Sequence, residues 1–319
     1  MQSIGSLKRW AMVALAVAVM SGCSAVGRMA VNRVADSLSA GGSAFASDED
    51  PDLVLEAIPF GLKTYESLLA VSPKHRGLLL SSASGFAAYA FLLRQQAELD
   101  PREDYAARRR LDKRVSRLFL RARDYALRGL ALEHPDLPVT LIANPAATLS
   151  NVRKADVPFL YWAGIGWAGA VSAAKDSPQL LADLPTAAAF MARALELDET
   201  FDAGSIHEFF VTYEGSRPGG DVEAARAHYL RACELSHGDR ASTHLALAEG
   251  VSVQQQDVEE FRTLVRRTLA VDPNGVPEWR VANTLAQRRA TWLDARVSDL
   301  FVNVEGGDVE ENVNVSSIR

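Results

Sequence analysis

The stretch Ala225-Arg226-Ala227-His228-Tyr229-Leu230-Arg231-Ala232 places a bulky residue between two small ones, at the spacing small-x3-large-x2-small. Within a helix this spacing brings the three residues onto one face. A small residue on one helix admits the bulky residue of its neighbour, so that helical hairpins can stack around a shared core. The stretch therefore predicts stacked helical hairpins.

Two further segments have the same spacing, one upstream and one downstream. Its positions are Ala187, Met191 and Ala194 in the first, and Phe261, Val265 and Thr268 in the second. Equivalent terminal positions fall at Glu199, His237 and Pro273, so that successive units lie 38 and then 36 residues apart. This period is close to that of tetratricopeptide (TPR) hairpins, although the usual first-helix pattern is absent. A generic helical bundle with chance spacing is the alternative.

The body of the chain, residues 51–301, is predicted to be all-helical. Apolar residues recur there at three- and four-residue spacing, with almost no strand-like alternation. Helix boundaries are expected at prolines, because the residue before a proline disfavours the helical conformation. These steps are Asp50-Pro51, Ser72-Pro73, Asp100-Pro101, Ser177-Pro178 and Asp272-Pro273. The predicted fold class is all-α, a degenerate TPR-like α-solenoid of stacked hairpins.

The N-terminus has the features of a secretory signal that ends at a cysteine. Lys8-Arg9 precedes an apolar run of eleven residues, Trp10 to Met20, which is too short to span a bilayer. Ser21-Gly22 then leads directly into Cys23, as in a bacterial lipobox, whose cysteine is acylated before cleavage. We predict a lipoprotein signal peptide at residues 1–22 and lipidation at Cys23. An ordinary signal peptide with a chance cysteine is the alternative.

Two segments flank the predicted helical domain. Residues 23–50 are expected to form the lipidated N-terminus and a flexible tether, because they contain a stretch rich in serine and glycine. Residues 302–319 contain clustered acids and no aromatic residue, which predicts a disordered acidic tail. Ser24 follows the cysteine, a choice that favours the outer membrane in many Gram-negative bacteria. The predicted location is the periplasmic side of a bacterial membrane, with the outer membrane favoured.

Charge and cysteine content restrict the function. Loss of the signal peptide lowers the formal charge from −6 to −8, because it removes two cationic residues. Such an acidic chain is not expected to bind nucleic acid. Cys233 has no disulfide partner once Cys23 is lipidated, and we expect it to be a small core residue. The six histidines include no His-x3-His pair, and no metal, cofactor or catalytic set is predicted.

Three aromatic-rich regions are candidate ligand-binding sites. They contain Tyr161, Trp162 and Trp167 in the first, His207 in the second, and Trp279, Arg280 and Arg288 in the third. Aromatic side chains give apolar contact and an arginine can bind a carboxylate through two parallel hydrogen bonds, a combination that suits an organic acid. Core packing explains the third region almost equally well, because Arg288 shares one helical stripe with Trp292.

Two further motifs have both a functional and a structural interpretation. The run from Arg108 to Arg123 contains eight basic residues among sixteen, which could form a surface for anions or lipid headgroups. We favour an amphipathic core helix with a solvated basic exterior. Gly164, Gly166 and Gly169 superficially resemble a phosphate-binding loop, but no strand precedes them. We predict that these glycines allow close helix packing.

Several segments carry a more specific resemblance. They are residues 59–69 (PFGLKTYESLL), 83–86 (ASGF), 156–162 (DVPFLYW), 206–209 (IHEF), 216–220 (SRPGG), 277–283 (PEWRVAN) and 285–290 (LAQRRA). Together with the lipobox, they make the chain from about residue 20 to residue 301 similar to the T component associated with tripartite ATP-independent periplasmic (TRAP) transporters, called TatT. The resemblance implies a periplasm-facing lipoprotein of degenerate TPR hairpins with a cavity or pore for a hydrophobic ligand. It also implies a homotrimer that associates with the transporter's substrate-binding subunit.

These observations favour a non-enzymatic accessory protein. It would bind a small organic-acid or hydrophobic ligand near the membrane and dock the TRAP substrate-binding subunit. The alternative is a TPR-like scaffold in cell-envelope assembly that binds proteins and no small ligand. Aromatic residues enclosed in a pocket would favour the first hypothesis, and polar residues along an open groove the second.

Overall fold

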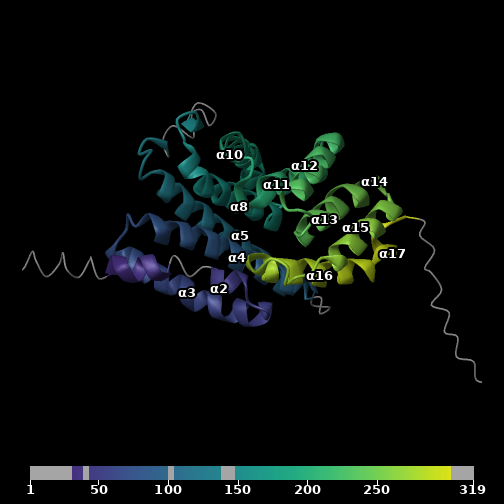
Figure 1. Ribbon diagram of the computed structural model, residues 1–319, viewed down its shortest axis with the longest axis horizontal. Helices are drawn as coiled ribbons and strands as arrows, with labels where there is room; N and C mark the ends of the chain where they lie inside the picture. The colour runs from purple at the N-terminus through teal and green to yellow at the C-terminus, as the bar shows by residue number, and fades with distance from the viewer. Residues whose placement is uncertain (1–30, 39–42, 100–103, 138–147, 303–319) are drawn as a thin grey trace, which may run out of the picture. The chain divides into compact units, whose positions relative to one another are not determined.

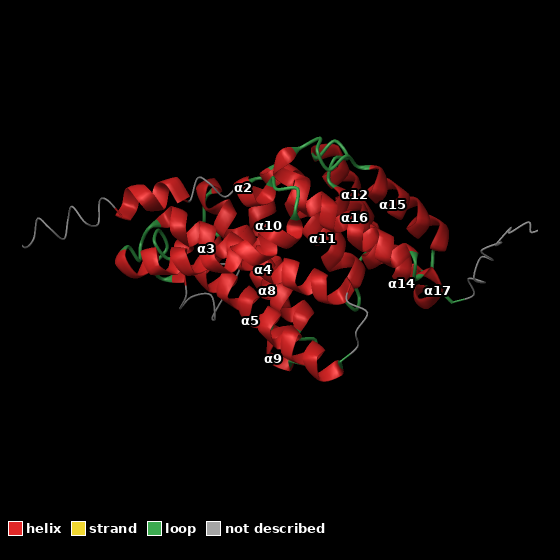
Figure 2. Cartoon of the chain, turned by 90° about the horizontal axis from the view of Figure 1, so that it is seen from below, coloured by secondary structure: helices red, strands yellow, loops and turns green. Residues whose placement is uncertain are grey.

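The computed structural model describes residues 31–38, 43–99, 104–137 and 148–302. The predicted signal peptide, the lipidation site Cys23 and residues 303–319 of the predicted tail lie outside the described residues. All regular structure among the described residues is helical, as Figure 2 shows. The all-α prediction is therefore confirmed for this part of the chain, while the TPR-like solenoid stays a prediction.

The chain divides into two compact units. Unit 1 runs to Ile206 and also includes Pro273–Val281. Unit 2 consists of His207–Asp272 and the chain from Ala282 onward. The chain thus leaves the first unit, returns to it for a short segment, and leaves it again.

Unit 1 contains the longest helices. They are α2 (Ser43–Ala46), α3 (Pro51–Val71), α4 (Arg76–Leu99), α5 (Tyr105–Leu130), α8 (Val157–Ala173), α9 (Pro178–Ala182) and α10 (Leu184–Leu197). Short 3-10 turns are η1 (Lys154–Asp156), η2 (Phe201–Gly204) and η4 (Pro277–Trp279). Four predicted proline steps are described and lie at helix ends, since α3 and α9 begin with proline, α3 ends before Ser72-Pro73 and α15 (Val258–Ala270) ends before Asp272-Pro273. Pro59, in contrast, lies inside α3.

Helix α5 packs along both α4 and α8, and these three helices run beside one another in Figure 1. Glycines on α8 allow the close approach. A Cβ at Gly166 would lie 2.7 Å from the backbone nitrogen of Arg123 and 2.8 Å from the carbonyl oxygen of Phe119. A Cβ at Gly169 would lie 2.5 Å from the Phe119 ring. The prediction that these glycines serve helix packing is confirmed.

Helix α4 is the one described helix that is long and apolar enough to cross a membrane. Half of its most apolar window is buried inside the protein. Its buried residues include Leu78, Leu79 and Phe86, which are at most 3% exposed. They make α4 a core helix of unit 1.

A buried carboxylate holds the turn before α8. Asp156 accepts hydrogen bonds from Arg76 at 3.0 Å and from the backbone nitrogen of Arg153 at 3.3 Å. Its other contact is with Nε2 of His134, at 3.0 Å. Burial raises the pKa of Asp156, but the hydrogen bonds from His134 and Arg76 outweigh burial and leave the pKa below its usual value. The ionised carboxylate thus ties α8 to distant parts of the chain.

Unit 2 is built from shorter helices. They are α12 (Val222–Leu235), α13 (Ala241–Leu247), α14 (Val253–Gln255), α15 (Val258–Ala270) and α17 (Val297–Leu300), with the π-helical turn η3 (Ala248–Ser252) between α13 and α14. Two helices begin in unit 1 and lie mostly in unit 2, namely α11 (Ser205–Ser216) and α16 (Arg280–Asp294).

The repeat positions identified in the sequence are buried. Those of unit 2 are Ala225, Tyr229, Ala232, Phe261, Val265 and Thr268, each at most 6% exposed. Four of the six, Ala225, Tyr229, Phe261 and Val265, belong to the apolar core of this unit, where Tyr229 and Phe261 supply the bulk. The hydroxyl of Tyr229 accepts a hydrogen bond from Arg267 and lies 3.0 Å from Nδ1 of His244. Small residues therefore alternate with bulky ones in the core, as the spacing predicts.

Candidate functional site

A pocket of about 400 Å³ lies in unit 1, where α4 ends, α5 begins and α8 gives way to a turn. It is lined by Arg94, Tyr105, Arg108, Arg109, Asp112, Lys113, Ser172, Ala173, Ala174, Lys175 and Asp176. Five of these side chains are cationic and two are acidic. The pocket is large enough for a small molecule and carries an excess of positive charge.

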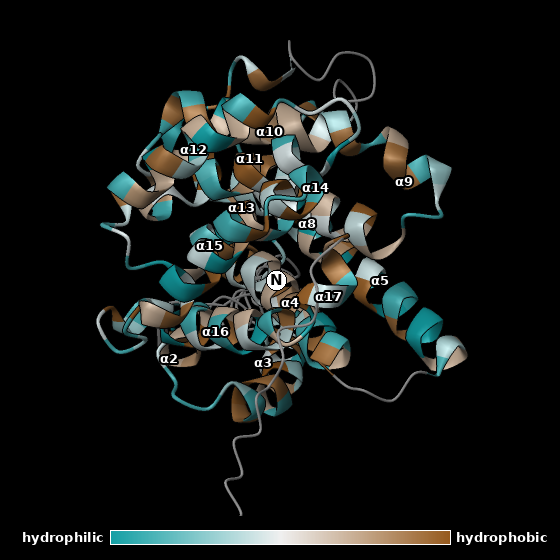
Figure 3. Cartoon of the chain, turned by 90° about the vertical axis from the view of Figure 1, so that its right-hand side faces the viewer, coloured by the Kyte–Doolittle hydropathy of each residue, from teal (hydrophilic) through white to brown (hydrophobic). Residues whose placement is uncertain are grey.

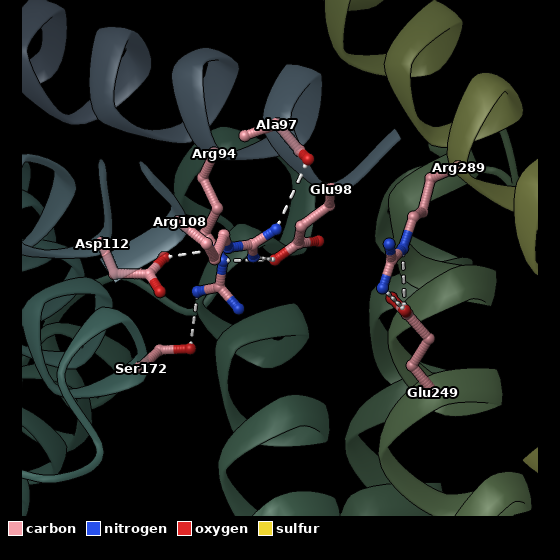
Figure 4. Close-up of polar contacts among 8 residues, drawn as sticks. All are labelled: Arg94, Ala97, Glu98, Arg108, Asp112, Ser172, Glu249 and Arg289. Atoms are coloured by element: carbon pink, nitrogen blue, oxygen red, sulfur yellow. Dashed lines mark hydrogen bonds and ion pairs between the residues drawn. The ribbon is translucent and has the colours of Figure 1, made fainter. Parts of the chain in front are cut away.

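Two arginines form the inner wall through a hydrogen-bond network, which Figure 4 shows. Arg94 donates to Glu98 at 2.8 Å and to the Ser172 hydroxyl at 2.7 Å. Arg108 donates to Asp112 at 3.2 Å and to Glu98 at 3.4 Å. The network fixes both guanidinium groups in position before any ligand arrives.

The rim of the pocket differs from its inner wall. Lys113 and Lys175 are exposed, and neither forms an ion pair or hydrogen bond with the rest of the described chain. Arg109 donates to Asp176 at 2.5 Å and to the Tyr105 hydroxyl at 3.1 Å. The rim therefore offers two uncommitted ammonium groups to an anion, beside a tyrosine that is 74% exposed.

The predicted residues Tyr161 and Trp162 lie next to each other on α8. Their rings meet edge to face, with centroids 5.0 Å apart. The Phe201 ring, from η2, lies 5.2 Å from that of Tyr161. Both predicted residues are half-buried, so this aromatic group combines core packing with an accessible side.

The predicted residue Trp167 is a core residue of unit 1, only 6% exposed. Its ring packs edge-on against Phe190 at 5.2 Å, and the Arg123 guanidinium covers it at the same distance. Its indole N–H has no hydrogen-bond acceptor among the described residues. Packing with a cation over the ring is the role that the geometry supports.

Trp279 and Arg280 lie at the junction of η4 and α16. Arg280 donates a hydrogen bond of 2.8 Å to the carbonyl oxygen of Ser47. This contact ties the returning segment of unit 1 to the chain just before α3, and α2 packs against η4. The arginine is thus engaged with backbone rather than held open for a carboxylate.

His207 and Arg288 belong to unit 2. Nδ1 of His207, which is 6% exposed, lies 2.8 Å from Nδ1 of His228, and the Phe210 ring stacks on His228 at 5.0 Å. Burial and the neighbouring His207 lower the pKa of His228. The two histidines therefore share a proton-donor and acceptor contact inside an aromatic group.

Arg288 is exposed on α16, and the adjacent Arg289 is half-buried. Arg289 donates to one oxygen of Glu249, on the π-helical turn η3, at 3.0 and 2.7 Å, as Figure 4 also shows. The Trp292 ring lies under the guanidinium groups of both Arg289 and Arg296. Neighbouring arginines on one helix thus have different environments.

None of the seven predicted ligand residues lines the described pocket. The structure brings Tyr161 and Trp162 together, and it brings Trp279 and Arg280 together. Their roles in ligand binding stay predictions. Sequence reasoning noticed the basic run that supplies Arg108, Arg109 and Lys113 but missed Arg94 and Lys175. The excess of basic residues between Arg108 and Arg123 was the one sequence feature that pointed toward this pocket.

No group of three or more metal-ligating side chains occurs within the described ranges. Burial raises the pKa of the Cys233 thiol, which disfavours the reactive thiolate. Burial also raises the pKa of Tyr229 to about 12. These two buried groups act as hydrogen-bonding core residues at neutral pH.

The described residues are all-helical and enclose a basic pocket in unit 1. The profile of the family described as "TRAP transporter T-component" matches residues 47–301. An uncharacterized protein of Treponema pallidum (strain Nichols) is 28% identical over 270 residues, which cover 81% of this chain and 83% of that protein. The chain belongs to the TRAP transporter T-component family, whose members are accessory components of bacterial transporters.

Proposed function

We propose that this T-component binds a small organic acid in the basic pocket of unit 1 and passes it to the substrate-binding subunit of the transporter. The observation that carries the proposal is the composition of the pocket, in which five cationic side chains outnumber two carboxylates. Of the two predicted ligand classes, organic acids and hydrophobic molecules, we therefore propose an organic acid for this pocket.

A carboxylate matches the pocket chemically. Hydrogen bonds to ionised partners are shorter and stronger than neutral ones, and lysine ammonium groups supply them without a fixed geometry. Lys113 and Lys175 are uncommitted, while Arg94 and Arg108 are held by Ser172, Glu98 and Asp112 in the wall behind them. The pocket can therefore retain an anion without chemical change, as hand-over requires.

The apolar part of the ligand would contact a small surface. Ala173 and Ala174 line the pocket, and Tyr105 adds an aromatic ring at the rim. This surface suits a short carbon chain. A long hydrophobic ligand would instead require the aromatic group of Tyr161 and Trp162, which is the second candidate site.

Family membership and the N-terminal sequence support a cellular setting for the proposal. Lipidation at Cys23 would hold the protein at the periplasmic side of the membrane, with the outer membrane favoured, where a soluble substrate-binding subunit can dock. TPR-like stacking and a homotrimer belong to the same proposal. The alternative is a scaffold in envelope assembly, in which the helical surfaces bind proteins and no small ligand.

A calorimetric titration with small carboxylates tests the pocket directly. Glutarate and butyrate serve as probes, and butyramide is the neutral analogue of butyrate. Replacement of both Lys113 and Lys175 by glutamine is expected to weaken carboxylate binding by at least tenfold, because charged hydrogen bonds are lost. Two exposed lysines outside the pocket provide the control for net charge, Lys74→Gln with Lys63→Gln, of which Lys63 pairs with Glu66. Equal binding of butyrate and butyramide, or equal losses in both variants, would reject the pocket as the acid site.

Native mass spectrometry tests assembly and ligand together. The gently purified protein is expected to be a trimer that releases a discrete carboxylic acid on denaturation. An empty monomer would favour the scaffold. A deletion strain whose organic-acid uptake is unchanged for every candidate substrate would count against a role in transport.

A further inference from the structure

A row of cations runs along the outer side of α5. Arg110, Lys113 and Arg117 are exposed and follow each other at spacings of three and four residues. At about 100° per residue they lie within roughly 60° of one another around the helix. They therefore form one stripe, and Figure 3 shows hydrophilic residues along α5.

The stripe is electrostatically uncommitted. None of its three residues forms an ion pair or hydrogen bond with the described remainder of the chain. Other basic residues of α5 have partners, since Arg114 donates to the Tyr89 hydroxyl at 2.8 Å and Arg121 pairs with Glu66. Intramolecular ion pairs thus explain part of the basic run and leave this stripe unexplained.

The stripe and the basic pocket use different sides of α5. Arg108 and Asp112, which line the pocket, are displaced by about 200° around the helix from Arg110. Lys113 stands between the two sides and belongs to both. Arg110 and Arg117 are therefore free to bind another partner while the pocket holds a ligand.

We propose that the α5 stripe binds the surface of an anionic phospholipid membrane. A straight row of cations complements a flat layer of phosphate groups, and each arginine or lysine strengthens such binding several-fold. Tyr105, at the start of the same helix, lines the pocket and is not part of the stripe.

The net negative charge of the protein means that contact with an anionic membrane would orient unit 1. The full chain has a formal charge of −6, so an anionic membrane repels most of its surface. A local cationic stripe is then attractive on one side only. The membrane would fix which side of unit 1 faces the lipid, a role separate from ligand binding and from the lipid anchor of the proposed function.

Vesicle co-sedimentation tests the proposal without the anchor. The protein is residues 24–319, which include every described residue and exclude acylation at Cys23. Binding is compared between phosphatidylcholine vesicles with and without phosphatidylglycerol. We expect binding to the anionic vesicles alone, weakening as salt is added. Arg110→Gln combined with Arg117→Gln should lower the partition coefficient about thirtyfold.

A pair of arginines on another helix provides the control for net charge, and these two have side-chain partners, Glu259 and Thr263. Arg262 and Arg266, on α15, are four residues apart, and their replacement by glutamine changes the net charge equally. The control variant should bind anionic vesicles within a factor of two of the unchanged protein. Both variants should bind butyrate normally, which separates this test from that of the pocket.

Two outcomes would overturn the proposal. One is equal binding to neutral and anionic vesicles, and the other is an equal loss of binding in the stripe and control variants. If the stripe variant keeps its vesicle binding but loses the substrate-binding subunit in a pull-down, the stripe is a protein-docking surface instead.

Discussion

The α5–α8 pair in unit 1 and the repeat helices of unit 2 solve the same packing problem differently. Gly166 on α8 lets two backbones meet with no side chain between them. In unit 2, small residues such as Ala225 on α12 share one core with bulky residues such as Leu245 on the neighbouring α13, so that side chains fill the interface. A backbone contact tolerates no added atom, whereas a side-chain interface can relax. Unit 1 should therefore be the less tolerant of substitution.

Each unit also contains a carboxylate in a hydrogen-bond network, and the two networks differ in the sequence separation of the residues that they connect. Asp156 of unit 1 pairs with Arg76, 80 residues away. Glu260 of unit 2 pairs with Arg226, 34 residues away, and accepts a hydrogen bond from Ser252, eight residues away. Burial raises the pKa of Glu260, but the hydrogen bonds from Arg226 and Ser252 outweigh burial and leave the pKa below its usual value. Long-range order in unit 1 thus depends more on one charged group.

The largest expected effect is at Gly166. Gly166→Ala should lower the free energy of unfolding by about 3 kcal/mol, because the new Cβ would overlap backbone atoms of α5. Urea denaturation followed by circular dichroism measures the change. Gly61→Ala, in α3, is the control, since its Cβ would meet only Phe45, at 3.8 Å. It should gain about 1 kcal/mol from helix propensity. Equal stability of the two variants would contradict the claim that the α5–α8 contact tolerates no added side chain.

The second effect is at Asp156. Asp156→Asn should cost about 2 kcal/mol near neutral pH, because a buried charge-assisted network loses its anion. Denaturation at a series of pH values measures the cost. The folded pKa lies below the unfolded value of about 3.9, so the carboxylate's contribution is present above that pH. It is lost as pH falls through the folded pKa, and the gap between variant and parent should close there. A pH-independent gap would contradict the ionic explanation.

The smallest effect is at helix caps, where the units should behave alike. Asp104 caps α5 and Asp257 caps α15, each through hydrogen bonds from backbone nitrogens. Alanine at either position should cost about 1 kcal/mol, because the cap is a local interaction. The asparagine variants should retain most of the stability in urea denaturation. Losses as large with asparagine as with alanine would show that charge rather than capping matters.

The sequence predicts much of this fold because packing leaves a local pattern. The positions Ala225, Tyr229 and Ala232 are buried as their spacing indicates, and the glycines of α8 pack as expected. The pocket leaves no such pattern. Its inner wall depends on Arg94 reaching Ser172, 78 residues along the chain, and no local spacing encodes that pairing. The basic run showed charge, but a run alone does not reveal which cations are already neutralised.

The return of the chain to unit 1 has a consequence for the order of folding. Arg280 bonds to Ser47 across 233 residues, within a unit that is interrupted by much of unit 2. Unit 1 therefore cannot close until the chain beyond most of unit 2 is present. Contacts of such high sequence separation slow folding. The N-terminal helices would wait with an incomplete surface, so this protein should fold more slowly than its local helical content suggests.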